Sequence, residues 1–169
     1  ALVFFCSRSR SSAEKFQQEF HGAGVLEDFD EVLGAEQIEA VVIASPPEYH
    51  QEQIVKALRA GKSVLVEKPM CLTREQVEAI GEVLKAHPEL FLMVAENYYY
   101  KPSLALIKQL VAQEWIGRLE SVAVSKCFEQ EAAGWKSQYG ALLEGGVHFV
   151  ALISDLFDAV PQHVEAEFP

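Results

Sequence analysis

The sequence is poor in cysteine and in positive charge. Three cysteines, Cys6, Cys71 and Cys127, stand far apart among 169 residues, and their odd number suits neither a disulfide framework nor a zinc site. We therefore expect a reducing, cytoplasmic location. The 14 Lys and Arg against 25 Asp and Glu give a net charge of −11, which repels phosphate backbones. This charge argues against nucleic acid or an anionic membrane as the partner.

Several other signals are also missing from the sequence. We find no apolar run close to the roughly 18 residues that cross a bilayer and no charged leader before a cleavage site, so neither an anchor nor export is expected. The chain lacks a Cys–His cluster, a His-x-x-x-His pair, a G-x-S-x-G elbow and a phosphate-cradling G-x-G-x-x-G loop. A metal site is not expected.

What the sequence does contain is an alternation of strand and helix patterns. Half of the residues are hydrophobic, which excludes wholesale disorder. Apolar runs at residues 2–6, 39–44, 63–66 and 91–95 predict strands. Capping-box spacings at Ser11 with Glu14 and at Thr73 with Gln76 predict helix starts. This alternation predicts an α/β fold with a doubly wound parallel sheet, a partial Rossmann domain over residues 1–97.

The pattern changes near residue 98. We predict a helix over 103–115, an antiparallel strand over 119–128 and an apolar helix over 141–157 that Gly145 and Gly146 interrupt. Alternation over 164–168 predicts a further strand. Residues 98–169 therefore read as the start of a second, α/β (α+β) domain with an open sheet. Because the sequence opens without Met on an apolar run and stops within this pattern, we expect it to be an internal fragment.

Functional residues are expected just after each strand, since ligands of parallel α/β sheets bind beyond the strands' carboxyl ends. Ser7 and Arg8 follow the first strand, where a dinucleotide site meets the adenosine ribose. A guanidinium with hydroxyl donors suits a 2′-phosphate, so NADP is favoured over NAD. A plain basic surface turn explains the same two residues about equally well.

Two further patterns carry possible acid–base chemistry. Lys68, in Glu67-Lys68-Pro69, stands at a strand end and could stabilise charge on a carbonyl or alkoxide oxygen. Taken alone, this tripeptide is more often a solvated turn. Glu144 and His148 are four residues apart, so on a helix they could share a face, and the carboxylate could fix the imidazole tautomer. A surface ion pair or a capped helix start is an equally good interpretation of that spacing.

The motifs in their order resemble the glucose–fructose oxidoreductase/inositol dehydrogenase (Gfo/Idh/MocA) family. The resemblance is carried by the runs 41–50 and 57–69, by Asn97 with the aromatics and Lys-Pro that follow, by the Ile116-Gly117 turn and by Gly146-Val147-His148. It implies a two-domain NAD(P)-dependent oxidoreductase acting on a sugar, a polyol or a related small molecule. It also implies a homo-oligomer formed through the sheet of the second domain.

The resemblance also implies roles for individual residues. It makes Lys68 catalytic, with Pro69 following a cis bond, and His148 the proton-transfer residue, with Glu144 at a position that is usually aspartate. The residues implied at the cofactor are Ser7, Arg8, Ser45, Pro46, Pro47, His50, Glu67, Lys68, Pro69 and Asn97.

Two departures from the family pattern leave other readings open. Ala151 stands where an acid is common, and the glycine-rich loop is absent, which predicts much reduced affinity for NADP because no loop amides cradle the pyrophosphate. A non-catalytic dinucleotide sensor or scaffold, or a truncated piece without activity of its own, are the alternatives to a dehydrogenase.

Overall fold

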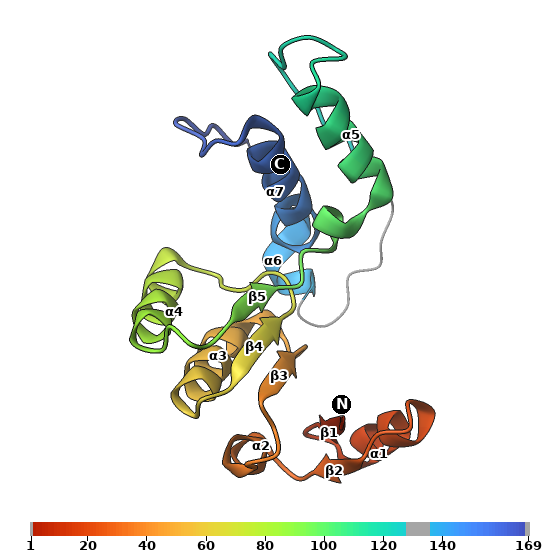
Figure 1. The fold of residues 1–169 in the computed structure, drawn as a ribbon, viewed down its shortest axis with the longest axis vertical. Coiled ribbons are helices and arrows are strands. Elements are labelled where there is room, and N and C mark those ends of the chain that lie inside the picture. The colour runs from red at the N-terminus through yellow and green to blue at the C-terminus, as the bar shows by residue number, and fades with distance from the viewer. Residues whose placement is uncertain (1, 128–135, 168–169) are drawn as a thin grey trace. The chain divides into compact units, whose positions relative to one another are not determined.

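The chain divides into two units, Ala1–Val94 and Ala95–Pro169. A computed structural model describes residues 2–127 and 136–167 (Figure 1). The sequence predicted a domain boundary after residue 97. The boundary between the two units lies three residues earlier, after Val94, where the last strand ends.

The first unit contains two parallel sheets. Strands β1 (Phe4–Cys6) and β2 (Gly24–Leu26) form one pair. Strands β3 (Ala40–Ile43), β4 (Ser63–Val66) and β5 (Leu92–Val94) form the other sheet in that order. The parallel α/β prediction is confirmed, although the three-residue strand β2 was not among the predicted strands.

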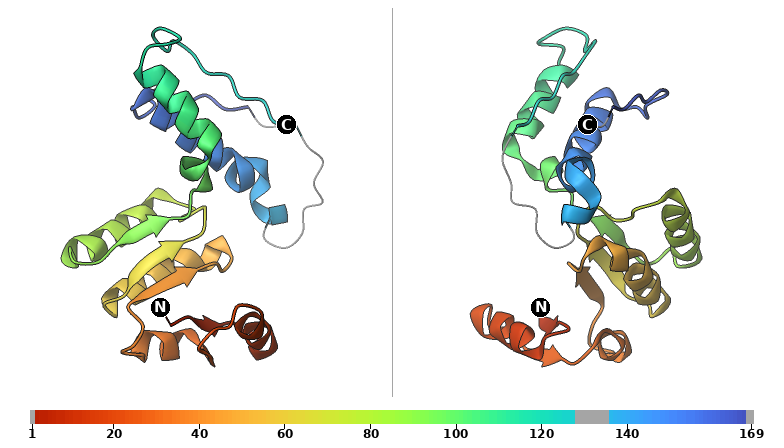
Figure 2. Two further views of the ribbon diagram at one scale, coloured as in Figure 1. Left: turned by 45° about the vertical axis from the view of Figure 1, so that its right-hand side comes forward. Right: turned by 180° about the vertical axis from the view of Figure 1, so that it is seen from behind.

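Helices connect these strands. They are α1 (Arg10–Glu19), α2 (Phe29–Gly34), the 3₁₀ turn η1 (Pro47–Tyr49), α3 (His50–Arg59) and α4 (Arg74–Ala86). Helices α3 and α4 lie side by side next to the three-stranded sheet (Figure 2). The helix between two parallel strands carries the chain back along the sheet, so both strands start at the same edge. The carboxyl ends of β3 and β4 therefore lie next to each other.

One predicted helix start is confirmed and one is wrong. At α4 the Thr73 Oγ1 accepts from the Gln76 N–H at 3.3 Å, and the Gln76 Oε1 accepts from the Thr73 N–H at 3.2 Å. At α1 the N-cap is Ser9 instead of Ser11, and its Oγ accepts from the Ser12 N–H at 3.3 Å. Several serines in succession satisfy the capping chemistry equally well, so the sequence does not select among them.

The core lies between one face of the three-stranded sheet and helices α3 and α4. Alternate strand residues, Val41 and Ile43, Val64 and Val66, are buried with Ile54, Leu58 and Ile80. The intervening row runs Val42–Leu65–Met93 across the sheet, and Val42 is 73% exposed. In this structure the sheet is therefore covered on one face.

A buried lysine ties α2 to β4. The Lys62 ammonium donates to the Ala35 carbonyl at 2.9 Å and to the Ile38 carbonyl at 2.8 Å, and the residue is 5% exposed. Two carbonyl oxygens compensate in part for the loss of water around the charge. Lys62, which comes six residues before Lys68, is thus a structural cation.

The second unit is helical in its described residues. It contains the 3₁₀ turn η2 (Asn97–Tyr100), α5 (Pro102–Ala112), α6 (Lys136–Ala141), the π-helical turn η3 (Leu142–Gly146) and α7 (Val147–Phe157). The strands predicted over 119–128 and 164–168 do not form within residues 119–127 and 164–167. A strand needs a partner for its backbone hydrogen bonds, and no strand lies in the described residues of this unit.

The statement that no apolar segment is long enough to span a bilayer is also corrected. Helical turns run from Tyr139 to Phe157, 19 residues whose length and composition alone would suffice. Gly145 and Gly146 lie within the π turn instead of breaking the helix. Only 6% of this segment is buried in the structure, although it carries the buried His148 and its Asp155 pairs with Lys108 of α5 at 2.7 Å.

Candidate active site

The structure gathers site residues into two clusters, one in each unit. The first cluster lies at the carboxyl ends of β3 and β4, which run side by side with Ile43 opposite Val66. The turn after β3 carries Ser45, Pro46 and the buried Pro47. The turn after β4 carries the exposed Glu67, the half-buried Lys68 and the buried Pro69. These predicted residues are therefore brought together at one sheet edge.

His50 joins these two turns. Its ring, fully buried at the start of α3, places Nε2 at 2.7 Å from the Ser45 carbonyl oxygen and Nδ1 at 2.9 Å from the Pro69 carbonyl oxygen. A carbonyl oxygen only accepts, so both bonds form together only when both ring nitrogens carry a proton. The histidine thereby fixes the backbone directly after Lys68.

The Lys68–Pro69 peptide bond is cis, as the family resemblance implied. The Lys68 N–H donates to the Glu67 Oε2 at 3.2 Å, so the acidic side chain folds back over the turn. The Lys68 side chain is partly shielded from solvent. An ammonium in such a position can interact with the oxygen of a bound molecule more strongly than one in bulk water.

Cys71 lies two residues after Pro69. Burial raises the pKa of the Cys71 thiol above its usual value. The side chain is unpaired, as are Cys6 and Cys127. The thiol therefore stays protonated to higher pH than an exposed cysteine would.

The end of β1 is the third strand end of this unit. Ser7 is half-buried, its Oγ accepts from the Ser9 N–H at 3.3 Å, and the Arg8 guanidinium lies 5.9 Å from the centre of the Tyr49 ring. Because Tyr49 ends the η1 turn, Arg8 connects the strand end of β1 with the turn after β3. Ser7 and Arg8 leave hydroxyl and guanidinium donors at the position predicted for a 2′-phosphate.

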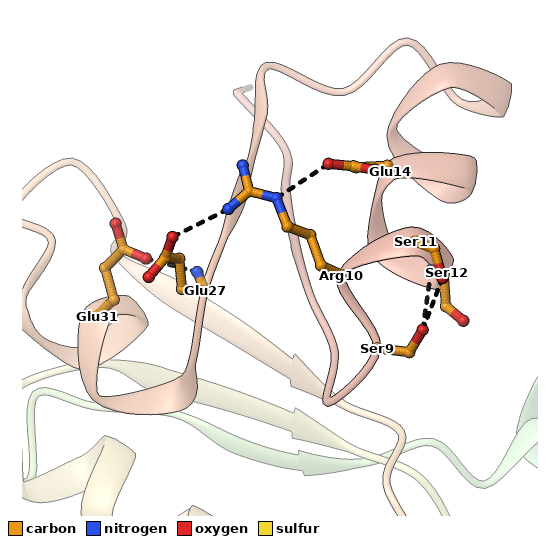
Figure 3. A network of polar contacts seen from close by, with 7 residues as sticks. All are labelled: Ser9, Arg10, Ser11, Ser12, Glu14, Glu27 and Glu31. Carbon is orange, nitrogen blue, oxygen red and sulfur yellow. Dashed lines mark hydrogen bonds and ion pairs between the residues drawn. The ribbon is translucent and has the colours of Figure 1, made fainter.

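The neighbouring Arg10 is engaged elsewhere. Its guanidinium donates to Glu14 at 3.0 Å and to Glu27 at 2.9 Å, as Figure 3 shows together with the Ser9 cap. The hydrogen bond to Glu14 raises the pKa of the Arg10 guanidinium. Two carboxylates already neutralise this cation, so Arg8 is the better candidate for binding an anion.

The second cluster surrounds His148 in the second unit. The His148 Nδ1 lies 2.6 Å from Oε1 and 2.8 Å from Oε2 of Glu96, and both residues are buried. Glu96 directly follows the predicted strand 91–95, at one of the strand ends where functional residues were expected, but the sequence did not pair it with His148. Glu144, the predicted partner, lies half-buried in the π turn before α7, and its role stays a prediction.

Tyr98 completes this cluster. Its ring stacks on the His148 imidazole with centres 4.6 Å apart and an angle of 9° between the planes. The Lys101 ammonium lies 3.5 Å from the centre of the Tyr98 ring. Tyr98 thus contacts both the Lys101 ammonium and the His148 imidazole. Asn97, between Glu96 and Tyr98, is exposed.

A small hollow lies beside this stack. It has room for about one water molecule. The residues lining it are Tyr98, Tyr99, Leu104, Lys108, Ala151, Leu152 and Asp155. Ala151, where the family commonly has an acid, thus contributes a methyl group to its wall.

Parallel strands alternating with helices, and polar groups at the strands' carboxyl ends, define a nucleotide-binding α/β protein of the Rossmann type. The chain matches the oxidoreductase family with an NAD-binding Rossmann fold over residues 1–96. It belongs to this family.

Named relatives agree with this assignment. The chain is 28% identical to the mouse trans-1,2-dihydrobenzene-1,2-diol dehydrogenase, over 98% of this chain and 51% of the relative. It is 32% identical to the dTDP-3,4-didehydro-2,6-dideoxy-alpha-D-glucose 3-reductase of Actinomadura kijaniata, over 87% of this chain and 45% of that enzyme. The chain spans about half the length of the curated relatives it matches.

Solved structures show the same likeness. A 3-ketoreductase from Actinomadura kijaniata, in complex with TDP-benzene and NADP, aligns with a TM-score of 0.79 at 30% identity, over 92% of this chain and 47% of that one. A scyllo-inositol dehydrogenase from Lactobacillus casei, with bound NAD(H) and scyllo-inositol, aligns with a TM-score of 0.64 at 34% identity, over 69% of this chain and 34% of that one.

Proposed function

We propose that this chain is the site-bearing part of a nicotinamide-dependent oxidoreductase that acts on a hydroxyl or carbonyl carbon of a sugar, polyol or related small molecule. The observation that carries the proposal is the first cluster. There Lys68 stands half-buried at a strand's carboxyl end, and His50 fixes the backbone that follows it. Relatives whose names describe sugar and inositol substrates support the substrate class.

The residues present fit two ends of a dinucleotide. Ser7 and Arg8 suit the ribose end, and Ser45 to Pro47 with Glu67 suit the nicotinamide end. A nicotinamide, when bound, supplies the acceptor or donor of a hydride. The residues of each unit then offer their own chemistry: Lys68 of the first unit can stabilise negative charge on a substrate oxygen, and His148 of the second can give or take a proton.

We further propose a preference for NADP over NAD, supported by Arg8 and by the absence of an acidic side chain directly after β1. Named relatives use both cofactors: the 3-ketoreductase complex contains NADP and the inositol dehydrogenase complex contains NAD(H). Fluorescence titration of the protein with NADPH and NADH tests the preference. Tighter binding of NADPH, weakened by Arg8→Ala, supports it, whereas equal affinities contradict it.

Assembly into a homo-oligomer, a cytoplasmic location and the absence of nucleic-acid and membrane partners remain proposals. They rest on the family resemblance, on the three cysteines and on the charge of −11.

The catalytic proposal is tested by Lys68→Ala. We expect turnover of a sugar or polyol with NADP to fall by roughly 10²-fold or more, as when a positioned acid or base is lost. Lys56→Ala is a suitable control, because Lys56 is exposed and pairs with Glu52 on α3. Unchanged turnover of the Lys68 variant would contradict its catalytic role, and the absence of turnover in the unaltered protein would favour the dinucleotide-sensor reading.

A further inference from the structure

The carboxylate of Glu96 has an unusual set of partners. It is 5% exposed, and its Oε1 accepts from the Tyr98 backbone N–H at 3.0 Å as well as facing the His148 Nδ1 at 2.6 Å. A carboxylate loses much hydration on burial and is stable there when such donors replace the water. The Tyr98 backbone N–H, in the turn that follows Glu96, therefore holds the Glu96 carboxylate, which faces the Nδ1 of His148.

The local alternative is weaker on geometric grounds. Glu144 and His148 would stack one turn apart in a regular α-helix. Glu144, however, lies in the π-helical turn Leu142–Gly146, whose wider spacing departs from the geometry of an α-helical turn. Glu96 and His148 are 52 residues apart in sequence, and the fold brings them to hydrogen-bond distance.

From this arrangement we propose that Glu96 is the positioning residue of His148, in place of the carboxylate expected at position 144. This proposal rests on the proposed function. Glu96 accepts the Nδ1 proton, so a neutral His148 carries its lone pair on Nε2. Tyr98, stacked on the ring, limits its rotation.

The proton balance follows from this tautomer. When the substrate hydroxyl is oxidised, its O–H bond breaks and an N–H bond forms at Nε2, while the hydride leaves the carbon for the nicotinamide. The Nδ1–H bond stays intact, and Glu96 remains a carboxylate that stabilises the imidazolium. Reduction of the carbonyl reverses each of these changes.

The tautomer can be read directly from ring ¹⁵N–¹H correlation spectra of the ¹⁵N-histidine-labelled protein at alkaline pH. We expect His148 to carry its proton on Nδ1 in the unaltered protein and in Glu144→Gln, and to lose this preference in Glu96→Ala. Glu96→Gln retains an acceptor oxygen, so the Nδ1 proton should persist there. Loss of the preference in Glu144→Gln with its retention in Glu96→Ala would overturn the proposal.

Kinetics provide the second readout. Glu96→Ala should lower kcat roughly 10²-fold with little change in KM, with partial recovery in Glu96→Gln. Glu165→Gln, an exposed glutamate of the same unit, is the control. If Glu96→Ala turns over normally while His148→Gln is inactive, Glu96 has no positioning role. If Lys68→Ala and His148→Gln both turn over normally, the catalytic roles of these residues fail. If the unaltered protein shows no turnover, the proposed function fails, whereas the tautomer measurement still tests the pair.

A folding defect is recognised separately. Circular dichroism and thermal unfolding of each variant report whether the fold is kept. Should Glu96→Ala not fold, the comparison of Glu96→Gln with Glu144→Gln in both readouts decides the question: a larger loss of kcat in Glu144→Gln would overturn the proposal.

Discussion

His50 and His148 are both buried, yet their surroundings differ. His50 lies between two backbone carbonyl oxygens, those of Ser45 and Pro69, whereas His148 faces the carboxylate of Glu96 and the ring of Tyr98. Both ring nitrogens of His50 face backbone carbonyl oxygens. At His148 the carboxylate lies at Nδ1, and the proposed mechanism assigns Nε2 to proton transfer. Burial alone therefore does not distinguish the two histidines, but the partners of their ring nitrogens do.

The largest expected effect is on turnover. His148→Gln should reduce kcat by roughly 10²- to 10⁴-fold, because an amide cannot exchange the substrate's proton, while thermal stability changes little. Steady-state kinetics and thermal unfolding measure the two. His163→Gln, at an exposed histidine, serves as the control. A variant that unfolds early while its remaining folded fraction turns over normally would place His148 with His50 as a structural residue.

Replacing His50 should affect stability first. His50→Leu removes the ring between the Ser45 and Pro69 carbonyl oxygens, so at least one of them loses its donor, and we expect a loss of about 1–3 kcal/mol in the free energy of unfolding. Urea unfolding measures it, again with His163→Gln as the control. The comparison breaks down if His50→Leu is as stable as the unaltered protein.

A smaller effect is expected at Tyr98. Tyr98→Leu removes the ring stacked on His148 and should lower kcat roughly 3- to 10-fold, in line with the 0.5–1.5 kcal/mol typical of aromatic pairs. Tyr98→Phe keeps the ring and should stay close to the unaltered rate. Equal losses in both variants would assign the effect to the hydroxyl group instead of the stacking.

The smallest effect is a change in thiol reactivity. Burial raises the pKa of Cys71, so less thiolate is present at pH 8 and alkylation should be slower than at the exposed Cys127. In His50→Leu the contact between the His50 ring and the Pro69 carbonyl is lost. The segment that contains Cys71 should then be exposed more often, so Cys71 should react a few-fold faster. Mass spectrometry of alkylated peptides separates the three cysteines. An unchanged rate would mean that His50 does not hold this segment.

The sequence predicted elements that depend on local chemistry. The Thr73–Gln76 capping box and strand β4 both follow from side chains close in sequence. It failed at residues 119–127, because alternation predicts a strand only when another strand is present to pair with it.

The candidate site was predicted in part for the same reason. Ser45, Lys68 and Pro69 follow strand ends, so their grouping could be inferred from the parallel sheet. The partner of His148 could not, because a spacing of four residues was the only pairing signal available, whereas Glu96 is 52 residues away. The only sequence signal that pointed to Glu96 was its place as an acid directly after the predicted strand 91–95.

Lys62 has a consequence for chemical labelling. Its ammonium lies inside the first unit and is bound by two backbone oxygens, so an acylating reagent can reach it only when the contact between α2 and β4 opens. Its acylation rate under native conditions thus reports how often that region opens. Acylation would also remove the charge, so each labelling event would trap the opened form and prevent it from closing again.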